Sequence, residues 1–246
     1  MSIIQIAGAG ASWPSTPASD PFAANLVLAL PLNISYGIRD VSSLIRGSGI
    51  SYSTTTFAGS FDGNSSKFYG SSLLTGSSSG SSTRLNATAI PAFGTGDFCI
   101  ETWLNIPSLG SFNFTIFRYH NDTNTGILFL YAGSSTTTPG ALYFANGDPA
   151  GSDVSLTPSY AVPTGQWNHI AVTRSGNTLR MFINGVNSVS YQPTGGVFGN
   201  FTYTGATLML LGTDTTYNTV RVQDYRVYQG VAKYTSNFTP PGAMLV

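Results

Sequence analysis

Side chains that could carry acid–base chemistry are few in this sequence, and only one of them is a glutamate. Glu101 lies in the segment FCIETWL, which alternates as a strand would. Residues two apart share a strand face, so the neighbours of Glu101 on that face are Cys99 and Trp103. Glycosidic hydrolysis needs two carboxyl groups, about 5 Å apart in retaining enzymes. Distant aspartates could converge on Glu101 in space, but no second acidic residue lies close to it on the same strand face. We therefore predict that Glu101 is a structural residue that forms hydrogen bonds at the edge of its strand.

His169 and the single cysteine are also predicted to be structural. His120 lies in the loop-like segment RYHNDTN, and His169 lies far from it, inside a hairpin pattern. Cys99 belongs to an apolar run and is expected to be a small buried residue. A lone cysteine excludes an internal disulfide and a cysteine-based zinc site. The glycine-rich stretch GSSSGSS lacks the lysine and the following helix of a phosphate-binding loop.

Charge is scarce along the whole chain. Ten basic and ten acidic residues cancel, charged residues make up 8% of the composition, and no Lys/Arg cluster occurs. Nucleic-acid binding, which needs concentrated positive charge, is therefore not predicted. A surface near neutrality favours a protein held in an assembly, such as a homo-oligomer. The N-terminal MSIIQIAGAGASWP is unlike a secretory signal, and no apolar run is long enough to span a bilayer, so we expect a soluble protein made in a cytoplasm.

The elements that must position these residues are predicted to be strands. Thirteen Tyr and 15 Phe, with β-branched residues between polar turns, indicate an all-β protein. The clearest stretch is GQWNHIAVTRSGNTLRMFINGV, residues 165–186, which predicts three strands and two tight turns. Asn184-Gly185 is the favoured pair for a type I′ turn. FDG is expected to turn between two short strands, and further strands are expected in NLVLALPLN, DFCIETWLNIP, FNFTIFRYHND, GILFLYAG, ALYFANGD, TLMLLGTD and VRVQDYRVYQG.

Two regions are expected along the chain. Residues 1–22 are small, polar and punctuated by proline, which predicts an extended N-terminal arm. Trp13 would be an anchor in this arm, although a frayed terminus is the alternative. Residues 23–246 would form one β body whose last segment, KYTSNFTPPGAMLV, is an extended tail.

Three blocks of this body resemble a known family. They are FAGSFDGN…FGTGDFCIETWLN, then GQWNHIAVTRSGNTLRMFINGV, then VRVQDYRVYQGVAKYTSNFTPP. Over roughly residues 25–241 they are similar to laminin-G-like jelly-roll domains of the concanavalin A-like lectin/glucanase superfamily. The resemblance implies two stacked antiparallel sheets. The last block looks like the form found in structural proteins of tailed bacteriophages.

The resemblance also raises the question of calcium. Relatives can hold the ion near loops that correspond to Lys67 and to Gln223-Asp224, where acidic residues are common. This chain departs from that pattern at both places, so no cofactor is predicted, and a weak calcium site at Asp40, Asp62 and Asp224 is the alternative. Local turn capping by these aspartates is the favoured explanation.

The resemblance implies a virion structural protein: a capsid decoration protein, head fibre or tail-associated protein on the particle surface. It would contact other virion proteins and display a jelly roll that binds host-surface carbohydrate. Trp103 and Trp167 are assigned to packing, and the loop residues Tyr119, His120 and Tyr217 are the candidate carbohydrate contacts. A free-standing lectin module and a glycoside hydrolase are the alternatives.

Overall fold

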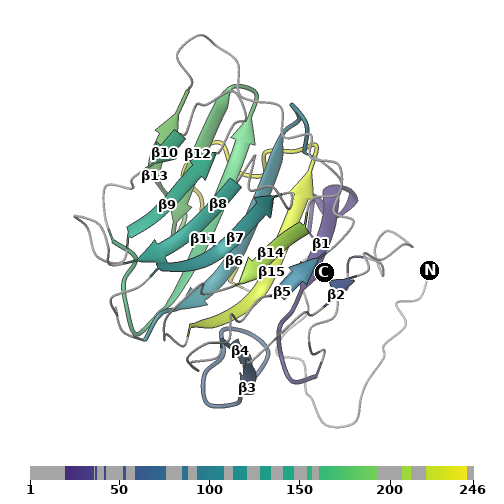
Figure 1. Ribbon diagram of the computed structural model, residues 1–246, viewed down its shortest axis with the longest axis vertical. Coiled ribbons are helices and arrows are strands. Elements are labelled where there is room, and N and C mark those ends of the chain that lie inside the picture. The colour runs from purple at the N-terminus through teal and green to yellow at the C-terminus, as the bar shows by residue number, and fades with distance from the viewer. Residues whose placement is uncertain are drawn as a thin grey trace.

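The computed structural model describes a body made mostly of β-strands (Figure 1). It describes residues 20–35, 37, 42, 52–53, 59–75, 85–87, 93–107, 113–120, 128–133, 141–146, 154–156, 161–192, 207–211 and 220–242. A short 3₁₀ helix, η1 (Ala23–Asn25), leads into the first strand. The described part of the chain has no apolar helix of the length that a bilayer crossing requires.

The strands of the described residues form two antiparallel sheets. The eight-stranded sheet has the order β13 (Val186–Tyr191), β12 (Thr178–Ile183), β11 (Trp167–Ser175), β6 (Phe98–Asn105), β15 (Arg221–Gln229), β4 (Ser72–Leu74) and β3 (Ser60–Asp62), with β1 (Leu26–Leu30) also paired to β15. The seven-stranded sheet has the order β10 (Val154–Leu156), β9 (Ala141–Asn146), β8 (Leu128–Gly133), β7 (Asn113–His120), β14 (Thr207–Leu211), β5 (Leu85–Ala87) and β2 (Tyr52–Ser53).

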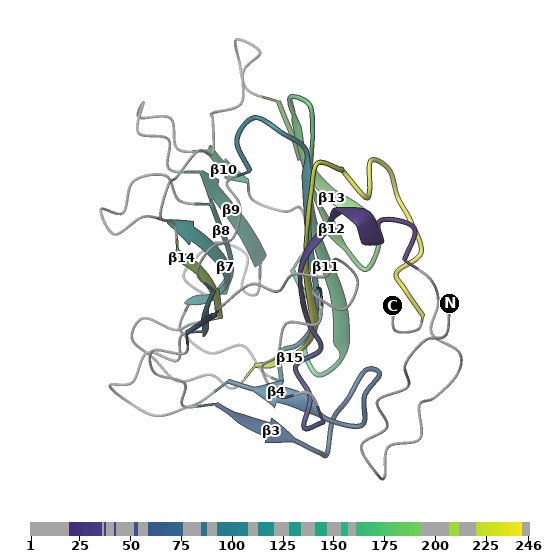
Figure 2. The same ribbon diagram turned by 90° about the vertical axis from the view of Figure 1, so that its right-hand side faces the viewer.

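The two sheets stack as a sandwich, and a third layer covers one of them. In Figure 2 the eight-stranded sheet lies between the seven-stranded sheet and the last described stretch of the chain, drawn in yellow. We call residues 231–240 the strap, and we call the sheet surface beneath it the outer face. Side chains of β6 alternate between this face and the sandwich core. All eight are buried, because the core covers one side and the strap and its neighbouring segments cover the other.

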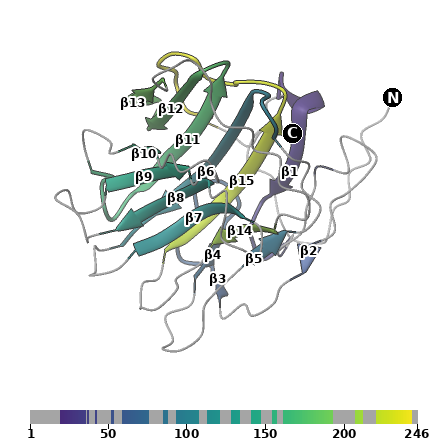
Figure 3. The same ribbon diagram turned by 45° about the horizontal axis from the view of Figure 1, so that its top comes forward.

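The register fixes which side chains meet on the outer face. Glu101 of β6 lies between Ala171 of β11 and Arg226 of β15, and Trp103 lies between His169 and Gln223. Figure 3 shows these three strands running side by side through the sheet. The pairing of β15 with β6 shifts between Gln223 and Arg226, which is a β-bulge.

The all-β, two-sheet jelly-roll sandwich predicted from the sequence is confirmed. β1 is buried on both faces and ends at Leu30, before Pro31, as predicted. The three strands of residues 165–186 form as expected, and Asn184 and Gly185 have the positive φ angles, 51° and 78°, of the predicted turn.

The expectation for FDG was wrong. β3 pairs with β4 from Ser60↔Leu74 to Asp62↔Ser72, so the whole of residues 63–71 joins the two strands as a loop. Residues 1–19 of the predicted arm lie outside the described residues. Asp20 is buried and Phe22 packs against the body, so residues 20–22 are fastened to the sandwich.

Replacing Gly185 by alanine is expected to destabilise the protein more than the same change at Gly176. Both glycines have positive φ, which costs alanine about 1–2 kcal/mol. A Cβ at Gly176 meets nothing within 4 Å, whereas one at Gly185 overlaps the carbonyl oxygen of Phe238 in the strap. Urea unfolding of both variants would measure the difference, and equal losses would contradict the packing of the strap on this turn.

Candidate functional site

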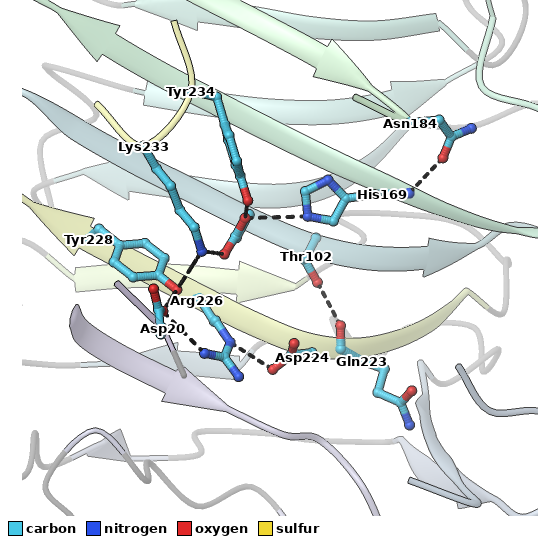
Figure 4. A network of polar contacts seen from close by, with 11 residues as sticks. Asp20, Thr102, His169, Asn184, Gln223, Asp224, Arg226, Tyr228, Lys233 and Tyr234 are labelled. Atoms are coloured by element: carbon cyan, nitrogen blue, oxygen red, sulfur yellow. Dashed lines mark hydrogen bonds and ion pairs between the residues drawn. The ribbon is translucent and has the colours of Figure 1, made fainter. Parts of the chain in front are cut away.

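The chemistry-bearing side chains gather on the outer face around Glu101. The Nζ atom of Lys233 lies 2.7 Å from one carboxylate oxygen of Glu101, and the hydroxyl of Tyr234 donates to the other at 2.8 Å. The Nε2 atom of His169 is 3.3 Å from that second oxygen. Lys233 and Tyr234 belong to the strap, so Glu101 joins the strap to the middle of the sheet (Figure 4).

Glu101 is held as a carboxylate. Its burial alone would raise its pKa, but the hydrogen bond from His169 and the charge of Lys233 outweigh that effect, and the pKa lies below its usual range. A general acid or nucleophile needs a carboxyl group that a substrate can reach. Glu101 is 3% exposed, and its two carboxylate oxygens are bound by strap residues.

The strap also ties down the start of the described chain. Asp20 accepts a hydrogen bond from the hydroxyl of Tyr228 and lies 3.6 Å from Arg226 and 3.8 Å from Lys233. Lys233 contacts the hydroxyl of Tyr228 at 3.0 Å as well. Two carboxylates, Asp20 and Glu101, therefore share one buried lysine, and segments from both ends of the chain meet at that cation.

Aromatic packing continues the strap across the sheet. The rings of Tyr234 and Phe238 stack with centroids 3.5 Å apart, and both meet the ring of His169 edge-on. The backbone oxygen of Tyr234 accepts a hydrogen bond from Thr173 at 2.8 Å. The amide of Phe238 donates to the oxygen of Gly185 at 2.9 Å, so the strap reaches from β15 to the β12–β13 turn.

Gln223 organises the loop of residues 63–71 beside the strap. Its side-chain oxygen accepts hydrogen bonds from the amides of Lys67 and Phe68, at 2.9 and 2.8 Å. Its side-chain nitrogen donates to the backbone oxygen of Ser71. An acidic residue could accept but not donate, so glutamine suits this position better than the acids common in the resembling family.

The prediction for Glu101 was correct in role but wrong in place. β6 runs from Phe98 to Asn105, so Glu101 is in the middle of its strand and not at the strand's edge, and β6 itself lies between β11 and β15. Its predicted neighbours Cys99 and Trp103 are buried, and Trp103 packs edge-on against His169 with centroids 5.1 Å apart. Cys99 is a buried free thiol, and Trp167 is half-buried.

Most of the predicted contact residues are not brought together. Tyr119 and His120 are strand residues and not loop residues, because β7 stays paired with β14 as far as Thr207↔His120. Tyr217, Asp40 and Trp13 lie outside the described residues. The carbohydrate contacts and the anchoring arm therefore stay predictions.

The two described aspartates of the calcium alternative each contact an arginine. Asp62 accepts the amide of Asn64 and lies 2.6 Å from Nε of Arg221; the hydrogen bond from Asn64 and then Arg221 lower its pKa. Asp224 lies 2.8 Å from Nε of Arg226. No group of three or more potential metal ligands is found among the described side chains. Asp62 caps a turn locally, as the alternative interpretation expected.

Replacing Lys233 by methionine is expected to cost about 3–5 kcal/mol of unfolding free energy, because two carboxylates lose their shared buried cation. Arg221→Met is the matched control: it removes a cation whose side chain is 25% exposed and should cost about 1 kcal/mol or less. Urea unfolding at pH 7 measures both. Equal, small losses would mean that the strap is not held by this ion cluster.

Comparisons with known proteins agree with this architecture. A family model described as the concanavalin A-like lectin/glucanases superfamily, of laminin-G type, matches residues 76–233. No curated protein sequence matches the chain.

Three solved structures illustrate the fold. The binding domain of Paraclostridial Mosquitocidal Protein 1 is 16% identical with a TM-score of 0.67, and the match covers 86% of this chain and 50% of that one. The receptor-binding domain of botulinum neurotoxin D is 14% identical with a TM-score of 0.63, covering 86% and 51%. The serotype D ligand-binding domain in complex with N-acetylneuraminic acid is 16% identical with a TM-score of 0.63, covering 86% and 49%.

This chain spans about half the length of those three chains. At such identities the likeness shows the fold, whereas the family model covers more than half of the 246 residues. The chain belongs to the concanavalin A-like lectin/glucanases superfamily, as a laminin-G-type domain.

Proposed function

We propose that this chain is a non-catalytic, lectin-like module that binds host-surface carbohydrate and is carried on a tailed-bacteriophage particle. The observation that carries the non-catalytic part is the state of Glu101. The superfamily's name covers both lectins and glucanases. The one glutamate of this chain is buried beneath the strap and fully hydrogen-bonded, so it cannot form one half of an open acid pair.

The carbohydrate part is supported by the fold. One toxin domain of the same fold is described in complex with N-acetylneuraminic acid, which is a sugar acid. Laminin-G-type sandwiches leave loops between their strands in which aromatic and amide side chains can contact a ligand. His120 is the last residue of β7 and Tyr119 precedes it, whereas Tyr217 is predicted from the sequence to lie in a loop.

A glycan array is expected to show saturable binding by the purified full-length protein. Binding should survive Glu101→Gln in any sample that remains folded, since a lectin needs no acid catalyst. Variants Tyr119→Ala and Tyr217→Ala test the predicted contacts in the same array. Release of reducing sugar from a β-glucan would contradict the non-catalytic assignment, and failure to bind any glycan would contradict the lectin assignment.

The particle part is supported by the sequence blocks and by the chain ends. The block GVAKYTSNFTPP resembles phage structural proteins. It directly follows β15 and contains the whole strap. Residues 1–19 contain no charged side chain and include Trp13, which suits an arm that docks on another virion protein. Asp20, the residue that follows this segment, is fastened to the sandwich by Tyr228 and Arg226.

Deleting residues 1–19 is expected to leave a folded protein that no longer joins particles. The deletion must stop before Asp20, because Asp20 is buried against Tyr228. Circular dichroism checks the fold, and the protein content of purified particles checks incorporation. Particles that retain the shortened protein would rule out the arm as the anchor.

A further inference from the structure

We propose that one end of the outer face, formed by Asn105, Trp167 and Arg221 with Lys67 beside them, is a subsite for an acidic sugar. The inference rests on the proposed carbohydrate-binding function and names its ligand class. It concerns the eight-stranded sheet, and so a different surface from Tyr119 and His120 on β7 of the other sheet.

The register places three of these residues in one row across the sheet. Asn105 of β6 is paired with Trp167 of β11 on one side and with Arg221 of β15 on the other. Paired residues point to the same face, and neighbouring strands lie about 4.8 Å apart. Trp103 is two residues back along β6 and shares this face. Four side chains from three strands therefore lie within the footprint of one sugar unit or two.

This row lies at the end of the outer face where two partly exposed side chains, Trp167 and Arg221, flank the buried Asn105. The rows at Glu101 and Cys99 lie beneath the strap, and the loop of residues 63–71 covers Trp103, with Phe68 edge-on at 5.6 Å between centroids. Trp167 is only half-buried, and the side chain of Arg221 is 25% exposed. An indole with accessible surface can stack on the apolar face of a sugar ring.

Two polar atoms at this end lack partners. The side-chain oxygen of Asn105 and the indole nitrogen of Trp103 are buried, and neither has a hydrogen-bond partner among the described residues. Such groups are exceptions in folded proteins and call for an explanation. One is an acceptor and the other a donor, which is the pair that a sugar hydroxyl satisfies. Lys67 lies over the Trp103 ring at 4.1 Å and is exposed, and an exposed cation–π contact is weak, so its side chain can turn aside.

The charge at this end selects an acidic ligand. Lys67 and Arg221 are two of only ten basic residues in the chain. Asp62 contacts Nε of Arg221 and cancels one of the two positive charges, so one remains. Asp62 contacts Nε of the Arg221 guanidinium, and the planar, forked shape of that group suits binding of a carboxylate. A carboxylate on the sugar would meet Lys67 and Arg221 while the ring stacks on Trp167.

The experiment compares sialyllactose with lactose by isothermal titration of the full-length protein. Sialyllactose should bind at least tenfold more tightly than lactose, and Trp167→Ala or Lys67→Met should each weaken sialyllactose binding at least tenfold. Arg180→Met, which removes a cation from β12 elsewhere in the same sheet, should change binding less than twofold. Because Lys67 is exposed, Lys67→Met is expected to fold. It therefore tests the subsite even if Trp167→Ala does not fold.

The outcomes separate this inference from the proposed function. Glycan binding that persists unchanged in the Trp167 and Lys67 variants would overturn the subsite and leave the lectin assignment standing. Equal binding of lactose and sialyllactose, or loss only in Tyr119→Ala and Tyr217→Ala, would overturn it in the same way. Failure to bind any glycan on the array would overturn both.

Discussion

The ion pair between Glu101 and Lys233 sets the architecture of the outer face. A carboxylate in the middle of a sheet is costly to bury unless charge and hydrogen bonds compensate for the lost water. Here the compensation comes from Lys233 and Tyr234, which lie 132 and 133 positions away along the chain. The strap must therefore lie on the sheet for the sheet to be stable, and the sheet must be formed for the strap to have a partner.

The same lysine couples the two ends of the described chain. Asp20 reaches it from the N-terminal side, and the Tyr228 hydroxyl lies between Asp20 and Lys233. A buried ion cluster of this kind selects one arrangement, because other arrangements would leave a charge without a partner. The proposed anchor, residues 1–19, directly precedes Asp20 in the sequence, and Asp20 is itself fastened to Lys233 of the strap.

Local periodicity predicted the strands well because each strand's pattern is contained in its own few residues. The alternation around Glu101 and the Asn184-Gly185 turn are examples, and both are confirmed. The strap was predicted only as an extended tail, since KYTSNFTPP has no period that reveals which surface it covers. Its contacts with Glu101 span more than a hundred residues, and so do those of Asp20 with Tyr228 and of Gln223 with residues 67 and 68. The error over FDG has a similar origin, because β3 continues through Asp62, which pairs with Ser72 of β4 and also contacts the distant Arg221.

Glu101 is the one glutamate in the sequence, so its charge state can be observed directly. Protein labelled with ¹³C only at glutamate should give a single side-chain carboxyl signal in NMR. Because its pKa is held below the usual range by His169 and Lys233, the signal should keep its ionised chemical shift down to about pH 3 while circular dichroism still shows the native fold. In Lys233→Met the signal should titrate at a higher pH. A native-state midpoint near the ordinary glutamate value of about 4.3 would contradict the buried, strap-bound carboxylate on which this account depends.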